Sequence, residues 1–175
     1  WTLVEHVPIE RYLNGVVPYE IGATSPQAAL AAQAVLARTW ALANSHRFKV
    51  DGYNLCSDTQ CQVYRDPSKS NQNIKKAIKK TAGKILTWQQ KPINTVYHAT
   101  NGGVMASVDE AWSTNPVPYL GMRLDGPKNW AREVDLPLSN EKYLKSFLFT
   151  ESEAFGSDHP LFRWERTLES SQIFK

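Results

Sequence analysis

An alanine-rich stretch with clear boundaries constrains the fold of this 175-residue chain more than any other feature. Ser25 is a typical N-cap, Pro26 suits the first helical position, and good helix formers follow to about Ala43. One stripe of this predicted helix is mostly alanine, which lets another element approach closely. We therefore predict a buried central helix, with a stripe formed by Leu30, Ala34, Ala37 and Ala41.

The same helix carries an arginine, Arg38, on an otherwise apolar stretch. Because an unpaired buried guanidinium is very costly, this side chain must reach water or find an acceptor. Glu20 is the partner that we expect for it. Pro18 removes a backbone donor just before Glu20, so a short helix is predicted over residues 8–14, ending near Gly15.

The rest of the chain shows helical patterns first and strand patterns later, which predicts an α+β fold with antiparallel hairpins. No internal repeat is visible. The expected elements are a basic amphipathic helix over 71–81 that ends at Gly83, a hairpin from 85–88 and 93–98, a tight turn at 101–103, a further short strand, an irregular stretch over 115–137, and a last helix over 139–149 capped by Ser139 or Asn140.

Composition narrows the class of protein. With 42% hydrophobic and 21% charged residues, and only 9 Gly and 10 Pro, the chain is neither disordered nor collagen-like. No apolar run approaches the length of a membrane-spanning helix. The sequence opens at Trp1, without an initiator Met or a signal peptide, so we expect a domain cut from a longer exported protein.

Positive charge is concentrated between Arg65 and Lys91, where eight basic residues face the single acid Asp66. Four of them form the polar side of the predicted helix at 71–81: Lys75, Lys76, Lys79 and Lys80. A solvated helix face is the favoured interpretation, and it is compatible with an anionic cell-wall environment. No aromatic residues are interleaved with these lysines, so nucleic acid is not an expected partner.

Two residues are candidates for chemistry. Glu20 is flanked by apolar residues, and partial desolvation would favour its protonated form, as a general acid requires. The alternative is an ordinary surface glutamate. His98 ends a predicted strand just before the turn at 100–103, where backbone N–H groups can face a ligand. A purely structural role for His98 is an equally good interpretation.

The two cysteines, Cys56 and Cys61, lie in a turn-rich loop. His46 lies upstream, so three candidate zinc ligands fall within sixteen residues. Zinc sites usually recruit four ligands, and a disulfide or two packed thiols is the preferred interpretation. Zinc remains the minority hypothesis.

Several blocks of this sequence, in order, resemble the SpoIID (stage II sporulation protein D) and LytB amidase-enhancer family. Five ordered blocks are a specific match, unlike a single short motif. They lie within residues 8–125 and are Ile9–Glu20 with Ser25–Ala41, Asp58–Tyr64, Thr81–Thr87, Tyr97–Gly103, and Trp112 with Pro118–Leu120; Arg163-Trp164 in the tail is also similar.

The resemblance implies a single domain over 1–175 that acts as a peptidoglycan lytic transglycosylase. Such an enzyme cuts glycan strands, preferably those stripped of stem peptides, and leaves 1,6-anhydromuramyl ends. It implies that Glu20 is the catalytic acid and base and that Arg38 orients Glu20 or a sugar substituent. A substrate groove would be lined or supported by Gln62, Tyr64, Tyr97, His98, Thr100, Asn101, Gly102 and Gly103.

The resemblance also implies a place outside the cytoplasmic membrane and no required cofactor. Some relatives carry zinc near the cysteine loop, often with a histidine before the second cysteine, where this chain has Gln60. The alternative from another class is a non-catalytic wall-binding module that stimulates an N-acetylmuramoyl-L-alanine amidase, its partner.

Overall fold

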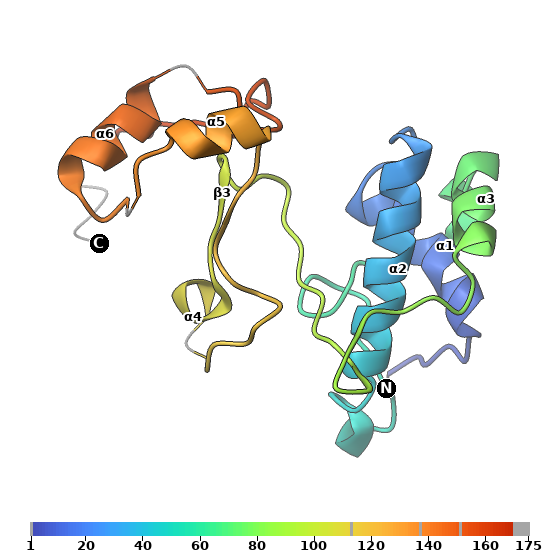
Figure 1. The fold of residues 1–175 in the computed structure, drawn as a ribbon. Helices are drawn as coiled ribbons and strands as arrows, with labels where there is room; N and C mark the ends of the chain where they lie inside the picture. Colours follow the sequence, from blue (N-terminus) through green and yellow to red (C-terminus); the bar gives the residue numbers. More distant parts are fainter. Residues whose placement is uncertain (1, 113, 137, 151, 170–175) are drawn as a thin grey trace. The chain divides into compact units, whose positions relative to one another are not determined.

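The computed structural model describes residues 2–112, 114–136, 138–150 and 152–169. Trp1 and the end of the tail, 170–175, fall outside the described residues. The chain divides into two compact units, Trp1–Tyr97 and His98–Lys175, each described here by itself. The single domain expected over 1–175 stays a prediction. Helices and short antiparallel strands make up both parts, which confirms the α+β class (Figure 1).

The first helix, α1, runs from Ile9 to Glu20 and is longer than predicted. Pro18 lies inside it and is buried, so the expected end near Gly15 is wrong. The proline forfeits one backbone hydrogen bond. Burial of the apolar face favours continuation of the helix, because Leu13, Val16 and Val17 are all fully buried.

Gly15 has a packing role in α1 instead of ending it. A Cβ atom at this position would lie 2.6 Å from the carbonyl oxygen of Arg65 and would also collide with the ring of Tyr64. The backbone N–H of Arg65 donates to the Gly15 carbonyl at 3.0 Å. The missing side chain therefore lets the segment around Tyr64 pack directly on the helix.

The second helix, α2, spans Gln27–Ala43, and its C-terminal end is where the sequence placed it. The N-cap residue is Pro26, so the expected cap at Ser25 is wrong by one position. The Ser25 hydroxyl instead donates to the Ile21 carbonyl at 2.7 Å. The four residues of the apolar stripe, Leu30, Ala34, Ala37 and Ala41, are at most 3% exposed.

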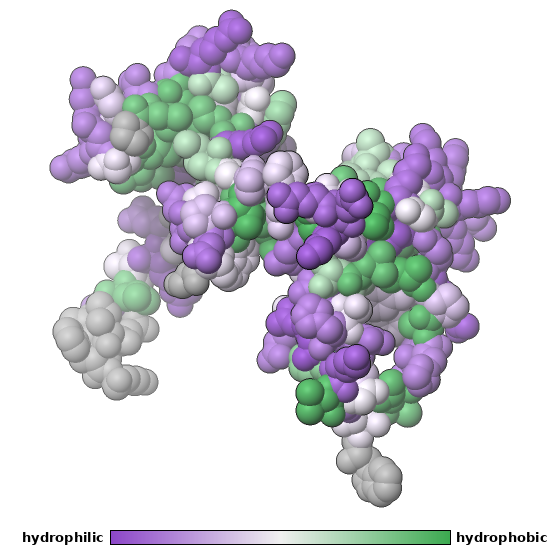
Figure 2. Space-filling model, turned by 60° about the horizontal axis from the view of Figure 1, so that its bottom comes forward, coloured by the Kyte–Doolittle hydropathy of each residue, from purple (hydrophilic) through white to green (hydrophobic). Residues whose placement is uncertain are grey.

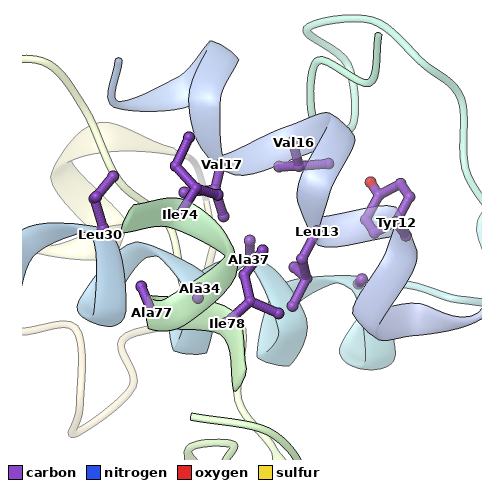
Figure 3. Packing of buried hydrophobic residues seen from close by; sticks show 11 residues of the cluster. Tyr12, Leu13, Val16, Val17, Leu30, Ala34, Ala37, Ile74, Ala77 and Ile78 are labelled. Carbon is purple, nitrogen blue, oxygen red and sulfur yellow. The ribbon is translucent and has the colours of Figure 1, made fainter. Parts of the chain in front are cut away.

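The core of the first unit lies where α1, α2 and α3 contact one another (Figure 3). Helix α3 spans Gln72–Lys80, and the side chain of Asn71 caps it by accepting from the Ile74 N–H at 3.0 Å. This confirms the predicted basic helix. Its buried side is formed by Ile74, Ala77 and Ile78, and its lysines are exposed.

A hairpin follows α3 and is attached to α2. Strands β1 (Thr87–Trp88) and β2 (Lys91–Pro92) pair through a two-residue turn in which Gln89 and Gln90 have φ of 49° and 63°. The first strand is shorter than predicted, and the second lies at Lys91–Pro92, in the segment expected to be the turn, so the strand expected over 93–98 is wrong. The buried Thr95 then donates its hydroxyl to the Leu36 carbonyl at 2.7 Å, which fixes the chain beside α2.

The second unit has its own small core around three buried side chains, Trp130, Ala154 and Phe162. Its strands β3 (Val104–Met105) and β4 (Arg123–Leu124) pair with each other. Its helices are α4 (Val108–Ala111), α5 (Lys128–Glu133) and α6 (Glu141–Phe149).

The last helix, α6, was expected and is capped by Asn140. Helices α4 and α5 were not expected, and α5 lies in the stretch predicted to be irregular. Pro137 in that stretch lies outside the described residues. The first unit also contains two short 3-10 turns, at Lys49–Asp51 and Pro67–Lys69.

The surface mixes hydrophilic and hydrophobic areas on both units (Figure 2). Among the described helices, none is long and apolar enough to cross a membrane.

Candidate functional site

Glu20 is the last residue of α1 and is half-buried. Its Oε1 accepts a hydrogen bond from the backbone N–H of Val63 at 2.8 Å. The continuous helix sets the position of the carboxylate, and the chain after the cysteine loop fixes its orientation. The sequence predicted the carboxylate but not its backbone donor, because no side-chain motif indicates which main-chain N–H will lie beside it.

A chain of polar side chains lies next to this carboxylate. The Tyr12 hydroxyl donates to Gln62 Oε1 at 3.2 Å, and Gln62 Nε2 donates to the Tyr97 hydroxyl at 3.3 Å. Gln62 is 1% exposed, so its amide depends on these partners. Two predicted groove residues, Gln62 and Tyr97, are thus brought together, while Tyr12 is a member that sequence reasoning missed.

The hydroxyl of Tyr97 is coupled to Glu20. Burial above all raises the pKa of Tyr97, and the negative charge of Glu20 and a hydrogen bond to it raise that pKa further. Burial likewise raises the pKa of Tyr12, with smaller contributions from Tyr97 and Glu20. Both phenols therefore stay protonated at neutral pH, and Tyr97 can act as a hydrogen-bond donor to the carboxylate.

Tyr64 packs against Tyr12, the first member of this hydrogen-bonded series of side chains. Its ring stacks on Tyr12 with centroids 5.2 Å apart, and its hydroxyl donates to Glu5 Oε2 at 2.9 Å. Burial, and then the bond to Glu5, raise the pKa of Tyr64. Because its hydroxyl is bound to Glu5, Tyr64 contributes a packing surface in this arrangement.

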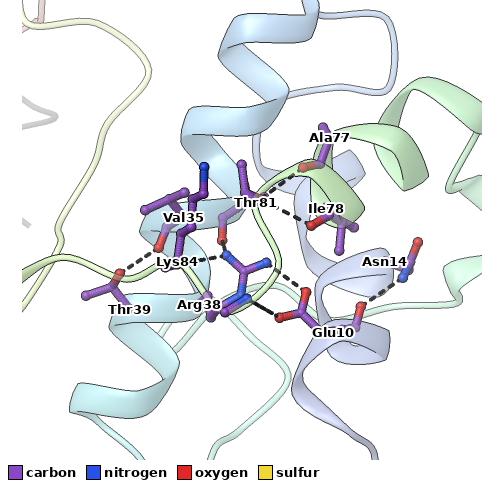
Figure 4. A network of polar contacts seen from close by, with 11 residues as sticks. Glu10, Asn14, Val35, Arg38, Thr39, Ala77, Ile78, Thr81 and Lys84 are labelled. Atoms are coloured by element: carbon purple, nitrogen blue, oxygen red, sulfur yellow. Dashed lines mark hydrogen bonds and ion pairs between the residues drawn. The ribbon is translucent and has the colours of Figure 1, made fainter.

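Arg38 does not pair with Glu20. Its guanidinium forms a two-pronged ion pair with Glu10, with Nε to Oε1 at 2.8 Å and Nη2 to Oε2 at 2.7 Å (Figure 4). Arg38 is 1% exposed and also donates to the Lys84 carbonyl at 3.0 Å. The expected partner is wrong because α1 is continuous, which separates its residues 10 and 20 by about 15 Å along the axis.

The ion pair joins three segments of the first unit. The hydrogen bond from Arg38 holds the pKa of Glu10 below its usual range, against the opposing effect of burial, and the backbone N–H of Gly83 adds to the lowering. Glu10 belongs to α1 and Arg38 to α2 (Figure 4). Gly83, whose N–H donates to Glu10, follows α3. In this structure Arg38 therefore stabilises helix packing and does not orient the candidate catalytic carboxylate.

The cysteine loop ends directly at the site. Cys56 and Cys61 form a disulfide, and Cys61 immediately precedes Gln62 and Val63. The bonded sulfurs are not thiolate ligands, and in the described ranges no group of three His, Cys, Asp or Glu residues could hold a metal ion. His46 therefore has no such ligand cluster around it. The residues present do not fit the minority zinc hypothesis.

The remaining candidates begin the second unit, and their placement is described within that unit alone. Gly102 and Gly103 form the predicted tight turn with φ of 63° and 94°. Asn101 Oδ1 accepts from the Gly103 N–H at 2.9 Å, and Thr100 Oγ1 accepts from the Gly102 N–H at 3.4 Å. His98 is exposed. That these residues share a groove with Glu20 stays a prediction.

The geometry defines an α+β protein in which a backbone N–H fixes the carboxylate of a glutamate at the end of a helix. Residues 1–88 match the family model described as Stage II sporulation protein (SpoIID), and residues 106–175 match a domain of unknown function (DUF8618). The chain belongs to the SpoIID family, which confirms the resemblance noted in its motifs.

Individual relatives agree with the family assignment. An uncharacterized protein of Brachyspira hyodysenteriae is 36% identical over 125 residues, which cover 68% of this chain and 32% of that protein. Stage II sporulation protein D of Bacillus amyloliquefaciens is 38% identical over 133 residues, 67% of this chain and 38% of its own length. The amidase enhancer of Bacillus subtilis is 37% identical over 113 residues, 65% and 15% respectively. The chain thus spans well under half the length of each.

Proposed function

We propose that this protein acts on the cell wall as a lytic transglycosylase that cleaves peptidoglycan glycan strands, with Glu20 as the catalytic residue. The observation that carries the proposal is the environment of the carboxylate. It is half-buried at a helix end, accepts a backbone hydrogen bond from Val63 at 2.8 Å, and has the protonated Tyr97 hydroxyl beside it.

One carboxyl group suffices for this reaction. Glu20 in its protonated form donates to the glycosidic oxygen, and the bond from that oxygen to the muramyl anomeric carbon breaks. The resulting carboxylate removes the proton from the 6-hydroxyl of the same sugar, whose oxygen bonds to the anomeric carbon and closes the 1,6-anhydro ring. Because the nucleophile belongs to the same sugar, no water has to be positioned. At the end of the reaction Glu20 is protonated again.

Denuded strands, extracytoplasmic location and the absence of a required cofactor belong to the same proposal. The disulfide of Cys56 and Cys61 supports an oxidising compartment, because such bonds are rare where cellular thiols stay reduced. Tyr97 and Gln62 would position the carboxylate. The other candidates would contribute to the substrate groove: His98, Thr100, Asn101, Gly102 and Gly103.

A second candidate function is favoured by the relative named amidase enhancer. In that case the chain binds wall polymer and an amidase without cleaving glycan itself. Purified protein incubated with denuded strands discriminates the two proposals: the enzyme produces 1,6-anhydromuramyl ends alone, whereas the enhancer produces none and raises the rate of an added amidase.

The catalytic assignment is tested in the same assay by Glu20→Gln. An exposed glutamate of α5 supplies the matched control, Glu133→Gln. We expect loss of the anhydro product only for the first variant. Equal yields from both variants would remove Glu20 from the chemistry.

A further inference from the structure

Helix α3 presents a face of exposed lysines without an ionic partner. Within the described ranges no carboxylate forms an ion pair with any of its four lysines: Lys75, Lys76, Lys79 and Lys80. The helix dipole favours cations in the last turn, which accounts for Lys79 and Lys80. Lys75 and Lys76 lie closer to the N-terminal end of the helix, where that benefit is absent.

The spacing of these lysines is unfavourable for the helix itself. Lys75 and Lys79 are four positions apart, and so are Lys76 and Lys80, so each pair places like charges side by side on the helix surface. Such pairs destabilise a helix, and α3 contains no acidic residue that would offset them. A bound anion would remove this repulsion.

A groove between α1 and α3 places two of the lysines next to an arginine. Its volume is about 410 Å³, and it is lined by Lys75 and Lys79 of α3 and by the exposed Arg11 of α1. The two lysines are about 6 Å apart along the helix axis. The groove therefore offers positive charge from both helices and at more than one point along its length.

The other polar residues of the lining are already used within the fold. Glu10 is paired with the guanidinium of Arg38 at 2.7 Å (Figure 4). The amide nitrogen of Asn14 donates to the Glu10 carbonyl at 2.9 Å, and its oxygen accepts from the Ser70 hydroxyl at 2.6 Å. The groups left to bind a ligand in this groove are therefore the cations.

The remaining lining is aliphatic. It consists of Ile78 and Ala82, and among the residues that the structure describes no aromatic side chain lines the groove. Single-stranded nucleic acids bind by stacking their bases on aromatic rings, so a nucleic acid is a poor match. A polyol chain joined by phosphodiesters is a better one, because its carbon units suit the aliphatic lining and each of its phosphates carries a permanent negative charge.

We propose that the groove between α1 and α3 is a binding site for a phosphodiester-linked polyol, an anionic polymer of the cell wall, with Arg11, Lys75 and Lys79 as its phosphate contacts. The site goes beyond glycan cleavage, since it holds the protein on a second component of the wall. It rests on the proposed place of the protein at the cell wall and not on the chemistry of Glu20.

Binding of fluorescently labelled poly(glycerol phosphate) to the whole chain tests this site. For Lys75→Gln/Lys79→Gln we expect a roughly tenfold loss of affinity at about 0.15 M salt, because two phosphate contacts are lost. The slope of log affinity against log salt concentration should shrink by about two, one for each contact. The matched control is Lys128→Gln/Lys142→Gln, which removes the same charge from two exposed lysines of the second unit and should bind like the wild type.

Equal losses in the two double variants would show that net charge alone attracts the polymer, and would overturn the site. A wild type that does not bind at this salt concentration would overturn it as well. Arg11→Gln tests the wall of the groove that α1 forms, and it should also weaken binding. Wild-type affinity in Arg11→Gln would overturn the assignment to the groove, because the lysine face alone would then bind.

Two other polyanions decide the chemical class of the ligand. Oligothymidylate and poly-L-glutamate with the same number of charges should both bind more weakly than poly(glycerol phosphate). Equal or tighter binding of the first would indicate a nucleic-acid site, and equal or tighter binding of the second would indicate an acidic protein partner. Either result would overturn the proposal.

Two further measurements separate binding from folding and from catalysis. Lys75→Gln/Lys79→Gln should melt at the same temperature as the wild type or higher, because a repulsion has been removed. A lower melting temperature would show that these lysines stabilise α3, and would contradict the argument. Glu20→Gln should bind the polymer like the wild type, so a protein without transglycosylase activity would lose the proposed function and keep this site.

Discussion

The carboxylate of Glu20 and the backbone N–H of Val63 are joined by a 2.8 Å hydrogen bond across 43 positions of sequence. Glu20 ends α1, and Val63 follows the disulfide of Cys56 and Cys61 by two residues. The geometry of the candidate catalytic group therefore depends on a loop that lies outside the helical core.

Removing the disulfide should loosen this contact. In the double variant Cys56→Ser/Cys61→Ser, we expect a loss of about 2 kcal/mol in the free energy of unfolding, the chain-entropy value for so short a loop. The activity of the protein that remains folded should also fall, because Val63 is no longer held against Glu20. Thermal unfolding with and without reductant measures the first effect; reductant should change the wild type and leave the double variant as it was.

The pair formed by Glu10 and Arg38 should account for a substantial part of the stability of the first unit. In Glu10→Gln the guanidinium of Arg38, 1% exposed, loses its counter-charge. Glu10 itself is 39% exposed, so the cost is reduced by solvent, and we expect about 2 kcal/mol in urea unfolding.

The matched control for this change is Glu5→Gln, at an exposed glutamate that accepts from Tyr64. Glutamine retains an accepting oxygen there, so the change should stay below about 0.5 kcal/mol. Equal effects of the two substitutions would contradict a structural role for the ion pair.

The same pair predicts an acid-sensitive contribution. The hydrogen bond from Arg38 lowers the pKa of Glu10 from its ordinary value of 4.5. The stabilisation is therefore complete above that value, where the unfolded chain is also ionised, and it is lost as the pH falls below it through the lower folded pKa. The difference in unfolding free energy between the wild type and Glu10→Gln, measured at a series of pH values, should shrink on acidification; a gap that widens would contradict this sign.

Gly15 should be intolerant of a side chain. Its Cβ would lie 2.6 Å from the Arg65 carbonyl oxygen, which is backbone and cannot rotate away. Gly15→Ala should cost roughly 2 kcal/mol by overpacking. At Gly121 an added Cβ meets nothing within 4 Å, and Gly121→Ala should be close to neutral. Thermal unfolding of both variants checks the difference, and a neutral Gly15→Ala would show that the contact with Arg65 relaxes freely.

Local signals in the sequence predicted the elements that local chemistry determines. Helix α3 lies within the predicted range 71–81, and α2 ends at Ala43 where the helix formers end. The break expected at Pro18 did not occur, because burial of the neighbouring valines is a tertiary effect that no window of sequence contains. The same continuation of α1 moved Glu20 away from Arg38 and left Glu10 as its partner.

The candidate site was predictable in its residue types and not in its contacts. Glu20, Gln62 and Tyr97 belong to motif blocks, but their assembly requires the disulfide loop and the attachment of Thr95 to α2. The Val63 N–H carries no sequence signal of its own. A backbone donor to a side chain becomes visible only once the chain is folded.

The central claim is that Glu20 drives glycan cleavage without water, and product analysis in ¹⁸O-labelled water tests it most directly. Denuded strands digested by the wild type should end in 1,6-anhydromuramyl groups without ¹⁸O, and Glu20→Gln, folded as the wild type, should form none. Reducing ends that carry ¹⁸O, or an undiminished yield of anhydro ends from Glu20→Gln, would contradict the account.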